Sequence, residues 1–277
     1  MQPLSEPATQ LETEIDPRTF HRIAEIVYAK AGIVLSDKKE ALVAARIGKR
    51  MRKLGLTRYR DYLALLEKAP EDGEPIEMLN AISTNVTQFF REPEHFDRLA
   101  GWLARWRAAG QTRFRLWCAA ASSGEEPYCM AMMVREQLPA TYDVRILATD
   151  LSTRALAEAC AGHYSAEDIQ PIPRELLARY FRKTEEDRFQ AGPALTTLIK
   201  FARLNLAHPP YPMHGPFDVI FCRNVMIYFD NDVRRRLLDE CHRLLRPEGF
   251  LVVGHSESLS GILGHFKSVE PSIYTKI

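Results

Sequence analysis

The most informative segment of the sequence reads Leu116-Trp-Cys-Ala-Ala-Ala-Ser-Ser-Gly-Glu-Glu-Pro-Tyr-Cys129. Its first residues are apolar, as in a buried strand, and they lead through small residues and Gly124 into a helical pattern. Small side chains let a ligand approach the backbone, and the first turn of a helix offers unpaired N–H groups. The segment therefore predicts a strand, a ligand-binding loop and a helix, although a strand–turn–helix unit without any ligand fits it equally well.

An acidic residue follows where nucleoside-binding folds use one. Asp150 ends the next apolar run, 26 residues after Gly124. In doubly wound sheets an acid at this place commonly accepts hydrogen bonds from ribose hydroxyls. The full G-x-G-x-x-G pattern is absent, which disfavours a dinucleotide cofactor and with it a nicotinamide enzyme.

Strands and helices alternate through the second part of the chain. Strand-like runs at 114–118, 144–148, 217–222 and 250–253 are separated by helical patterns at 129–138, 152–160 and 231–245. Such alternation predicts an α/β fold with a mostly parallel sheet covered on both faces. Residues 266–277 predict one or two short strands at the sheet edge, and residues 164–203, which contain three prolines, predict an insertion.

The first part of the chain has a different pattern. Residues 1–15 are polar and predict a mobile tail. Helical patterns run from Pro17 to Gly32, from near Ser36 to Leu54, from Tyr59 to Leu66 and from near Ile76. We therefore predict an all-helical domain with the start of a linker at 16–90, followed by the α/β domain at 91–277.

Residues 38–60 form a strongly basic segment. They hold nine Lys or Arg residues and one acid, a local charge of 9 − 1 = +8 in a chain whose formal net charge is +1. Arg46, Arg50 and Lys53 share one face of the predicted helix, apart from its apolar stripe. The segment fits an acidic partner or an ordinary solvated face. Nucleic-acid binding is disfavoured because the segment lacks the series of interleaved aromatic residues that single-strand binders use for base stacking.

The composition excludes several classes of protein. No apolar run reaches the roughly 18 residues of a membrane-spanning helix, and the N-terminus has no pattern of a secretory signal. The five cysteines are widely spaced without C-x-x-C, so they predict reduced thiols in the cytoplasm and neither disulfides nor a metal site.

Three further segments carry polar residues near the predicted sheet. They are Asn85-Val-Thr-Gln-Phe-Phe-Arg91, the pair Asn205-Leu206, and Phe217-Asp-Val-Ile-Phe-Cys-Arg-Asn-Val-Met-Ile-Tyr-Phe229. The last runs from a strand into Arg223-Asn224 at the carboxyl edge, where ligands bind in such folds. Helix capping by the first segment and a buried structural Tyr228 are the simpler interpretations.

The segments 116–129, 85–91 and 217–229, together with Gly254-His-Ser-Glu257, resemble the CheR family of chemotaxis methyltransferases. Matching pieces run from about residue 18 to residue 275. The resemblance implies a class I methyltransferase domain with an N-terminal helical domain and a small inserted antiparallel β-subdomain. It also implies S-adenosylmethionine as cofactor, S-adenosylhomocysteine as product and receptor glutamates as methyl acceptors.

The resemblance implies roles for matching positions. Arg91 and Tyr228 would place the attacking group near the methyl group. The cofactor would be held by Asn85, Thr87, Arg91, Glu126, Asp150, Asn205, Leu206, Arg223 and Asn224. Glu125 could share the part given to Glu126, and His255 either contacts the ligands or supports the pocket.

The resemblance also implies the partner, which is the cytoplasmic helical bundle of a chemoreceptor. Its acidic methylation helices would dock on Arg46, Lys49, Arg50 and Lys53 of the basic segment. We expect a monomer that binds no nucleic acid and inserts no segment into the membrane. Some family members hold a receptor peptide on the β-subdomain through a glycine-containing loop, whereas residues 182–192 here are short, charged and hold one glycine, Gly192, which favours an enzyme without this tether. Methyltransfer to another protein or small carboxylate, and a cofactor-sensing module without turnover, are the alternatives.

Overall fold

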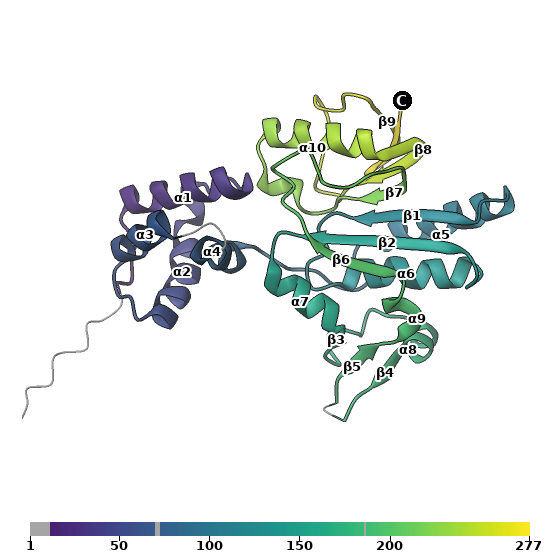
Figure 1. The fold of residues 1–277 in the computed structure, drawn as a ribbon, viewed down its shortest axis with the longest axis horizontal. Coiled ribbons are helices and arrows are strands. Elements are labelled where there is room, and N and C mark those ends of the chain that lie inside the picture. Colours follow the sequence, from purple (N-terminus) through teal and green to yellow (C-terminus); the bar gives the residue numbers. More distant parts are fainter. Residues whose placement is uncertain (1–11, 70–72, 186) are drawn as a thin grey trace, which may run out of the picture. The chain divides into compact units, whose positions relative to one another are not determined.

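The computed structural model describes residues 12–69, 73–185 and 187–277 (Figure 1). The chain divides into two compact units, with the boundary between Thr84 and Asn85. Across these described ranges, no helix is both long enough and apolar enough to cross a membrane.

The first unit is all-helical, as predicted. Its elements are α1 (Pro17–Ala31), the short 3-10 helix η1 (Asp37–Lys39), α2 (Glu40–Leu54), α3 (Tyr59–Lys68) and α4 (Glu74–Ile82). Asp16 caps α1 by accepting a hydrogen bond from the Thr19 N–H at 3.1 Å, and Gly32 ends the helix in the left-handed conformation. Phe20, Ile47 and Met78 are among the side chains that fill its core.

The predicted mobile tail needs a correction at its end. Residues 1–11 lie outside the described residues. Glu12, however, donates its N–H to Thr57 O at 2.9 Å and accepts the Tyr59 N–H on its carboxylate at 3.0 Å, and Ile15 is buried. The folded chain therefore begins before Asp16, because an apolar side chain and a helix-capping carboxylate hold it.

The second unit contains a seven-stranded sheet in the order β6-β2-β1-β7-β8-β10-β9. The strands are β1 (Arg113–Cys118), β2 (Asp143–Asp150), β6 (Ile199–Arg203), β7 (Phe217–Phe221), β8 (Leu245–Val252), β9 (Phe266–Glu270) and β10 (Ile273–Lys276). The first five in the spatial order are mutually parallel, and β10 runs antiparallel to both β8 and β9. The predicted mostly parallel sheet with short closing strands is confirmed.

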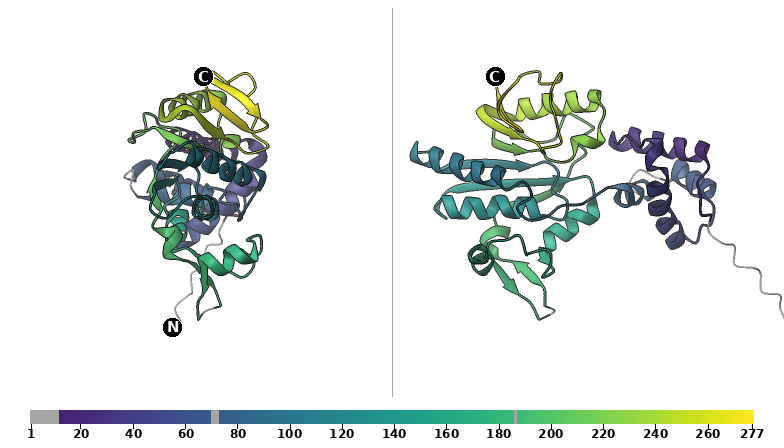
Figure 2. Two further views of the ribbon diagram at one scale, coloured as in Figure 1. Left: turned by 90° about the vertical axis from the view of Figure 1, so that its right-hand side faces the viewer. Right: turned by 180° about the vertical axis from the view of Figure 1, so that it is seen from behind.

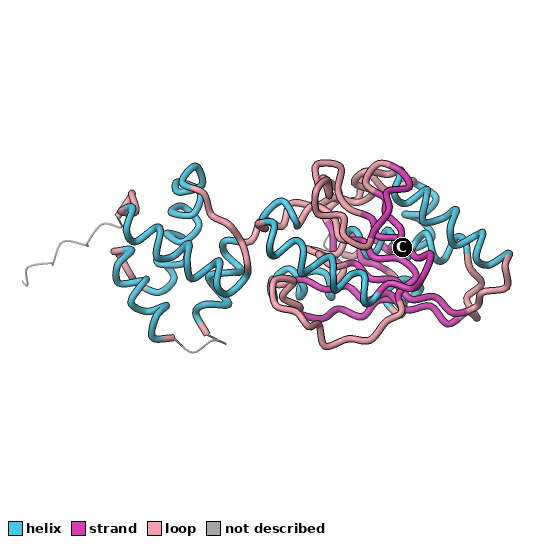
Figure 3. The backbone as a smooth tube through the Cα atoms, turned by 90° about the horizontal axis from the view of Figure 1, so that it is seen from above, coloured by secondary structure: helices cyan, strands magenta, loops and turns pink. Residues whose placement is uncertain are grey.

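Helices lie on both sides of this sheet (Figure 3). They are α5 (Glu94–Ala108), α6 (Glu125–Gln137), α7 (Thr153–Ala161) and α10 (Asn231–Leu244), with the 3-10 helix η2 (Met226–Tyr228) before α10. Helices α5 and α6 pack against each other and are seen in front of the strands in the view from behind (Figure 2). The Trp102 ring of α5 stacks on Phe250 of β8 with centroids 4.0 Å apart, which ties this helix to the sheet.

A small antiparallel sheet, β3-β5-β4, follows α7 (Figure 1). Its strands are β3 (His163–Tyr164), β4 (Phe181–Lys183) and β5 (Phe189–Ala191), accompanied by α8 (Arg174–Tyr180) and α9 (Pro193–Thr196). The insertion predicted at 164–203 was too long, since β6 pairs in parallel with β2 in the main sheet. The reason is packing, because Ile199 and Phe201 lie against the main core. Residue 186, in the charged loop of this sheet, lies outside the described residues.

The parallel strands end in register at one edge. Cys118 lies beside Ala148 on one side and Phe221 on the other, and Phe221 lies beside Val252. The loops that follow these strands therefore emerge side by side, at the carboxyl edge where open α/β sheets bind ligands.

Candidate active site

The loop after β1 is closely packed against its neighbours. Gly124 has φ +102°, and an added Cβ would lie 2.8 Å from the Tyr164 hydroxyl oxygen and 2.9 Å from Ala159 Cβ. Only glycine fits such a place without strain. The Tyr164 hydroxyl also donates to Ser123 O at 2.9 Å. The loop backbone is thus fixed by contacts from α7 and β3.

Asp150 links this loop to the end of β2. Its Oδ2 accepts the Ser122 N–H at 2.8 Å, and its Oδ1 accepts the Ser152 N–H at 2.9 Å. Burial raises the pKa of Asp150, while the backbone N–H donors oppose that shift. A carboxylate oxygen accepts more than one hydrogen bond, so both oxygens retain capacity for the paired hydroxyls of a ribose.

The segment 85–91 meets the same loop. The Ser122 hydroxyl donates to Asn85 O at 3.1 Å, and the Phe90 N–H lies 3.1 Å from Cys129 Sγ of α6. Phe89 is fully buried, and its ring packs edge-on against the ring of Tyr164, with the ring centroids 4.8 Å apart. Ser122 therefore joins the segment 85–91 to the Gly124 loop and to Asp150.

Arg223, which follows β7, is the centre of a buried ion network. Its Nη1 donates to Glu126 Oε2 at 2.6 Å, and its Nη2 donates to Glu92 Oε2 at 3.0 Å and to the Arg91 carbonyl. The Arg223 side chain is 1% exposed. Both Arg223 and Glu126, expected at the cofactor, thus also hold α6 and the segment 85–91 to the end of β7.

Glu92 extends this network to the end of β8. Its Oε1 accepts from Asn224 Nδ2 at 3.4 Å, and its Oε2 accepts the His255 N–H at 3.3 Å. Burial tends to raise the pKa of Glu92, but the Arg223 guanidinium and the Asn224 amide outweigh it and lower that pKa. One carboxylate therefore joins three loops.

Backbone strain is concentrated at this edge. Phe90, Glu92, Ser122 and Asn224 have φ values of +53°, +55°, +48° and +56°. L-residues rarely adopt this conformation, and it persists where surrounding contacts impose it. Four of the seven described non-glycine residues with positive φ lie in these loops, which is typical of a functional site.

The remaining predicted residues lie on the same loops. Arg91 is half-buried, and its Nη1 donates to Val86 O at 3.1 Å. Leu204 donates its N–H to Asp150 O at 3.0 Å, which places Asn205 and Leu206 next to the end of β2. The others are half-buried and lie on the segment 85–91 or in η2 (Thr87, Tyr228).

Two of the predicted substrate-binding residues are engaged within the first unit. Arg46 donates through Nη1 to Thr84 Oγ1 at 3.0 Å and to the carbonyl groups at the end of α4. Arg50 forms a two-pronged pair with Glu74, with Nη2 2.6 Å from Oε2. Lys49 and Lys53 are exposed. Acceptors on α4 and in the two residues after it thus hold both guanidinium groups, and docking of a substrate on these four residues stays a prediction.

The sequence analysis did not identify two side chains at this edge, those of Glu92 and His95. His95 of α5 is 1% exposed, its Nδ1 lies 3.4 Å from Glu92 Oε2, and neither ring nitrogen makes a hydrogen bond to a described residue. Ligand atoms of Glu92, His95 and His255 lie within 4.8 Å of one another, but Glu92 already balances Arg223. The position of Glu92 directly after Arg91 was the available signal.

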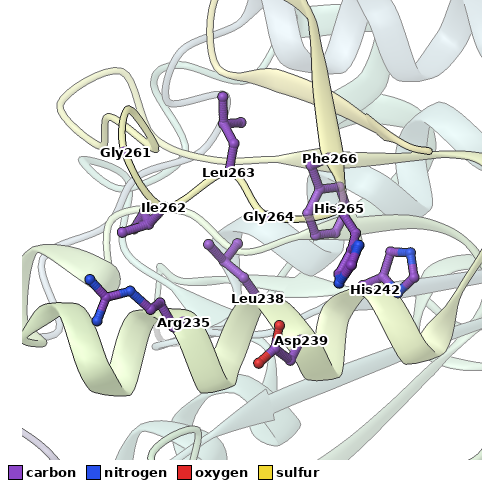
Figure 4. Close-up of a pocket in the computed structure, with 10 residues that line it drawn as sticks. All are labelled: Arg235, Leu238, Asp239, His242, Gly261, Ile262, Leu263, Gly264, His265 and Phe266. Atoms are coloured by element: carbon purple, nitrogen blue, oxygen red, sulfur yellow. The ribbon is translucent and has the colours of Figure 1, made fainter.

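A separate pocket of about 240 Å³ lies between α10 and residues 261–266 (Figure 4). Leu238, His242, Ile262 and Phe266 line it. It shares no residue with the loops described above.

Two family models match nearly the whole chain. The model described as "CheR methyltransferase, SAM binding domain" matches residues 85–275, and the one described as "CheR methyltransferase, all-alpha domain" matches residues 18–83. These ranges correspond closely to the two compact units.

Curated relatives agree with these models. A chemotaxis protein methyltransferase of Escherichia coli (strain K12) is 40% identical, with 92% of this chain and 89% of the relative covered. One of Borreliella burgdorferi is 36% identical with 96% of each covered. Chemotaxis protein methyltransferase 2 of Pseudomonas aeruginosa is 38% identical with 92% of each covered.

Proposed function

The chain belongs to the CheR methyltransferase family, and we propose that it methylates glutamate side chains in the signalling domain of a chemoreceptor. It is an S-adenosylmethionine-dependent methyltransferase, and its class I fold supplies the cofactor site. The observation that carries the proposed site is the junction at Ser122, which brings the Gly124 loop, Asp150 and the segment 85–91 together.

The residues at the carboxyl edge fit this cofactor. Asp150 offers two oxygens to a ribose diol, and the Ser122 N–H ties the Gly124 loop to the same carboxylate. We assign the rest of the cofactor contacts to the residues of the surrounding loops (Asn85, Thr87, Arg91, Glu126, Asn205, Leu206, Arg223 and Asn224).

The reaction requires the protein mainly to position the two reactants. When bound, S-adenosylmethionine supplies a methyl group on a positively charged sulfur, which is already a strong electrophile. A glutamate with a pKa near 4.3 is ionised at neutral pH, so no general base is required. The loops therefore act by orienting the carboxylate and excluding water.

Arg91 and Tyr228 are the residues that we assign to this placement. Arg91 lies on the segment 85–91, and its Nη1 donates to Val86 O at 3.1 Å. A guanidinium orients a carboxylate through paired N–H donors. Tyr228 ends η2, just beyond Arg223 and Asn224, and its hydroxyl is suited to the second contact.

The exposed lysines of α2 fit an acidic partner. Lys49 and Lys53 lie in a segment of local charge +8, and a glutamate-rich helix is complementary to such a surface. We place the enzyme in the cytoplasm, because the signalling domain of a chemoreceptor is there. We also propose that it acts as a monomer.

The test is a transfer assay with S-adenosylmethionine labelled in the methyl group and a receptor cytoplasmic fragment. Base-labile label on the receptor supports the proposal. Label on other proteins or on a small acid supports a different substrate, and binding of the cofactor without transfer supports a sensing module.

A variant pair tests the assignment of Arg91. Arg91→Ala should reduce turnover at least a hundredfold while leaving the melting temperature within a few degrees, because the hydrogen bond from its side chain to Val86 O is exposed. Arg98→Ala, which removes an arginine from an exposed pair with Glu270, is the matched control. Near-normal turnover in Arg91→Ala would remove it from the site.

A further inference from the structure

A buried carboxylate holds the two loops that carry Arg223, Asn224 and Tyr228. Glu257 is 6% exposed. Its Oε2 accepts the N–H groups of Asn224 and Gly254, and its Oε1 accepts that of Met226, each at 2.7 Å. These donors come from the end of β7, from the end of β8 and from the first residue of η2.

These hydrogen bonds specify one backbone path. An ionised acceptor makes short, strong bonds with N–H donors, and a buried N–H group left without an acceptor is costly. Asn224 has φ +56°, a conformation that needs support from its surroundings. Glu257 supplies this support directly at the Asn224 N–H.

Gly254 shapes the same place by its lack of a side chain. An added Cβ would lie 2.4 Å from Asn224 Nδ2 and 3.0 Å from both Asn224 Cγ and Asn224 N. The turn that joins Gly254 to Glu257 is closed by the Glu257 N–H, which donates to Gly254 O at 2.9 Å. The turn 254–257 therefore encloses both the backbone and the side chain of Asn224.

We propose that the turn 254–257 is a positioning element of the cofactor site, in which Glu257 and Gly254 set the conformation of Arg223 and Asn224. This inference rests on the proposed function. Glu257 touches neither reactant, and acts through the backbone that it holds. Through Met226 it also fixes the start of η2, whose Tyr228 N–H donates to Val225 O at 3.1 Å, and so the place of Tyr228.

The experiment compares Glu257→Gln with Glu240→Gln in the full chain. Glu240 is a matched control, since it is a buried carboxylate of the same unit that accepts the Tyr211 N–H at 2.8 Å and lies on α10. Melting temperature and the Kd for S-adenosylmethionine are measured for each. We expect both variants to lose stability, and only Glu257→Gln to raise the Kd, by at least tenfold.

The kinetics supply a second readout. Glu257→Gln should raise the KM for S-adenosylmethionine and leave the KM for the receptor fragment within twofold, because α2 is unaffected. A rise in Kd that merely follows the loss of stability, equal in both variants, would overturn the inference.

Gly254→Ala tests the same element without removing any hydrogen-bonding group. It should raise the Kd for S-adenosylmethionine at least tenfold by displacing the Asn224 side chain, and it decides the matter if Glu257→Gln fails to fold. Unchanged affinity in Gly254→Ala overturns the inference. If the wild-type chain itself binds no S-adenosylmethionine, the proposed function fails instead, so the two failures are distinguishable.

Discussion

Arg223 and Glu126, 97 residues apart in the sequence, form an ion pair of 2.6 Å in the interior of the second unit. The pair connects the end of β7 with the first turn of α6. Because Glu92 is the second acid at the same guanidinium, the network has one cation and two anions where the site loops meet.

The first prediction concerns the stability of this pair. Glu126→Gln should lower the free energy of unfolding by about 3 kcal/mol, since a buried charge loses an ionic partner. Urea unfolding of the variant measures the loss. Asp232→Asn breaks the exposed pair with Arg235 and should change it by less than about 1 kcal/mol. Equal losses in the two variants would contradict a special role for burial.

The second prediction concerns the glycine of the β1 loop. Gly124→Ala combines a left-handed backbone with a collision against Tyr164 and Ala159, and should cost about 3 kcal/mol and abolish cofactor binding. Gly110→Ala separates the two causes, because Gly110 has φ +88° with nothing within 4 Å of its added Cβ. It should cost only about 1 kcal/mol and leave cofactor affinity unchanged.

The third prediction concerns pH. Burial, with help from the positive charge of Arg223, lowers the pKa of His95 to about 4 from 6.5, against the opposing effect of Glu92 and Glu94. Between these values the unfolded chain takes up a proton that the folded chain does not, so this contribution to stability falls as pH falls from about 6.5 towards 4. From pH 7 to pH 5 the loss should be about 2 kcal/mol.

Urea unfolding at the two pH values tests this linkage by comparison of variants. His95→Gln should flatten the pH dependence by that amount. His163→Gln, which replaces an exposed histidine of β3, should leave the slope as in the wild type. A slope in His95→Gln equal to that of the wild type would show that other groups account for it.

The fourth prediction separates docking from folding on α2. The double change Lys49→Glu and Lys53→Glu should raise the KM for the receptor roughly tenfold, equivalent to about 1.4 kcal/mol, with the effect reduced at high salt. The Kd for S-adenosylmethionine should not change. Reversal of Lys200 and Lys267, exposed lysines of the second unit, changes the net charge equally and should leave the KM unaltered.

Patterns local in the sequence predicted much of this molecule. Alternating apolar runs specified the parallel sheet, and the residues around Gly124 and Asp150 pointed to the carboxyl edge because parallel strands must end there together. Such local patterns could not predict which side chains and which strands pair with one another. Whether Arg50 faces solvent or Glu74, and whether β6 pairs with β2 or with the small sheet, depends on contacts between residues distant in sequence.

The buried ion network around Glu92 was also not predicted from the sequence. Nothing in the run Arg91–Glu92 distinguishes a ligand-binding arginine from a carboxylate that gathers three loops, since the distinction arises only when Arg223, Asn224 and His255 arrive around Glu92. The family resemblance implied that Glu126 and Arg223 contact the ligand. The structure shows in addition that the two side chains form a buried ion pair.

The Tyr164 hydroxyl donates to Ser123 O and lies next to Gly124. This contact limits which chimeras between related enzymes can be made. The small sheet leaves and rejoins the chain at neighbouring points, since the Ala191 N–H donates to Gly162 O, so residues 163–191 form a natural unit for grafting. A chimera made there inherits the shape of the nucleoside loop from its donor. Transplants that keep a tyrosine at this position should therefore function in the new host, and those that lack it should not.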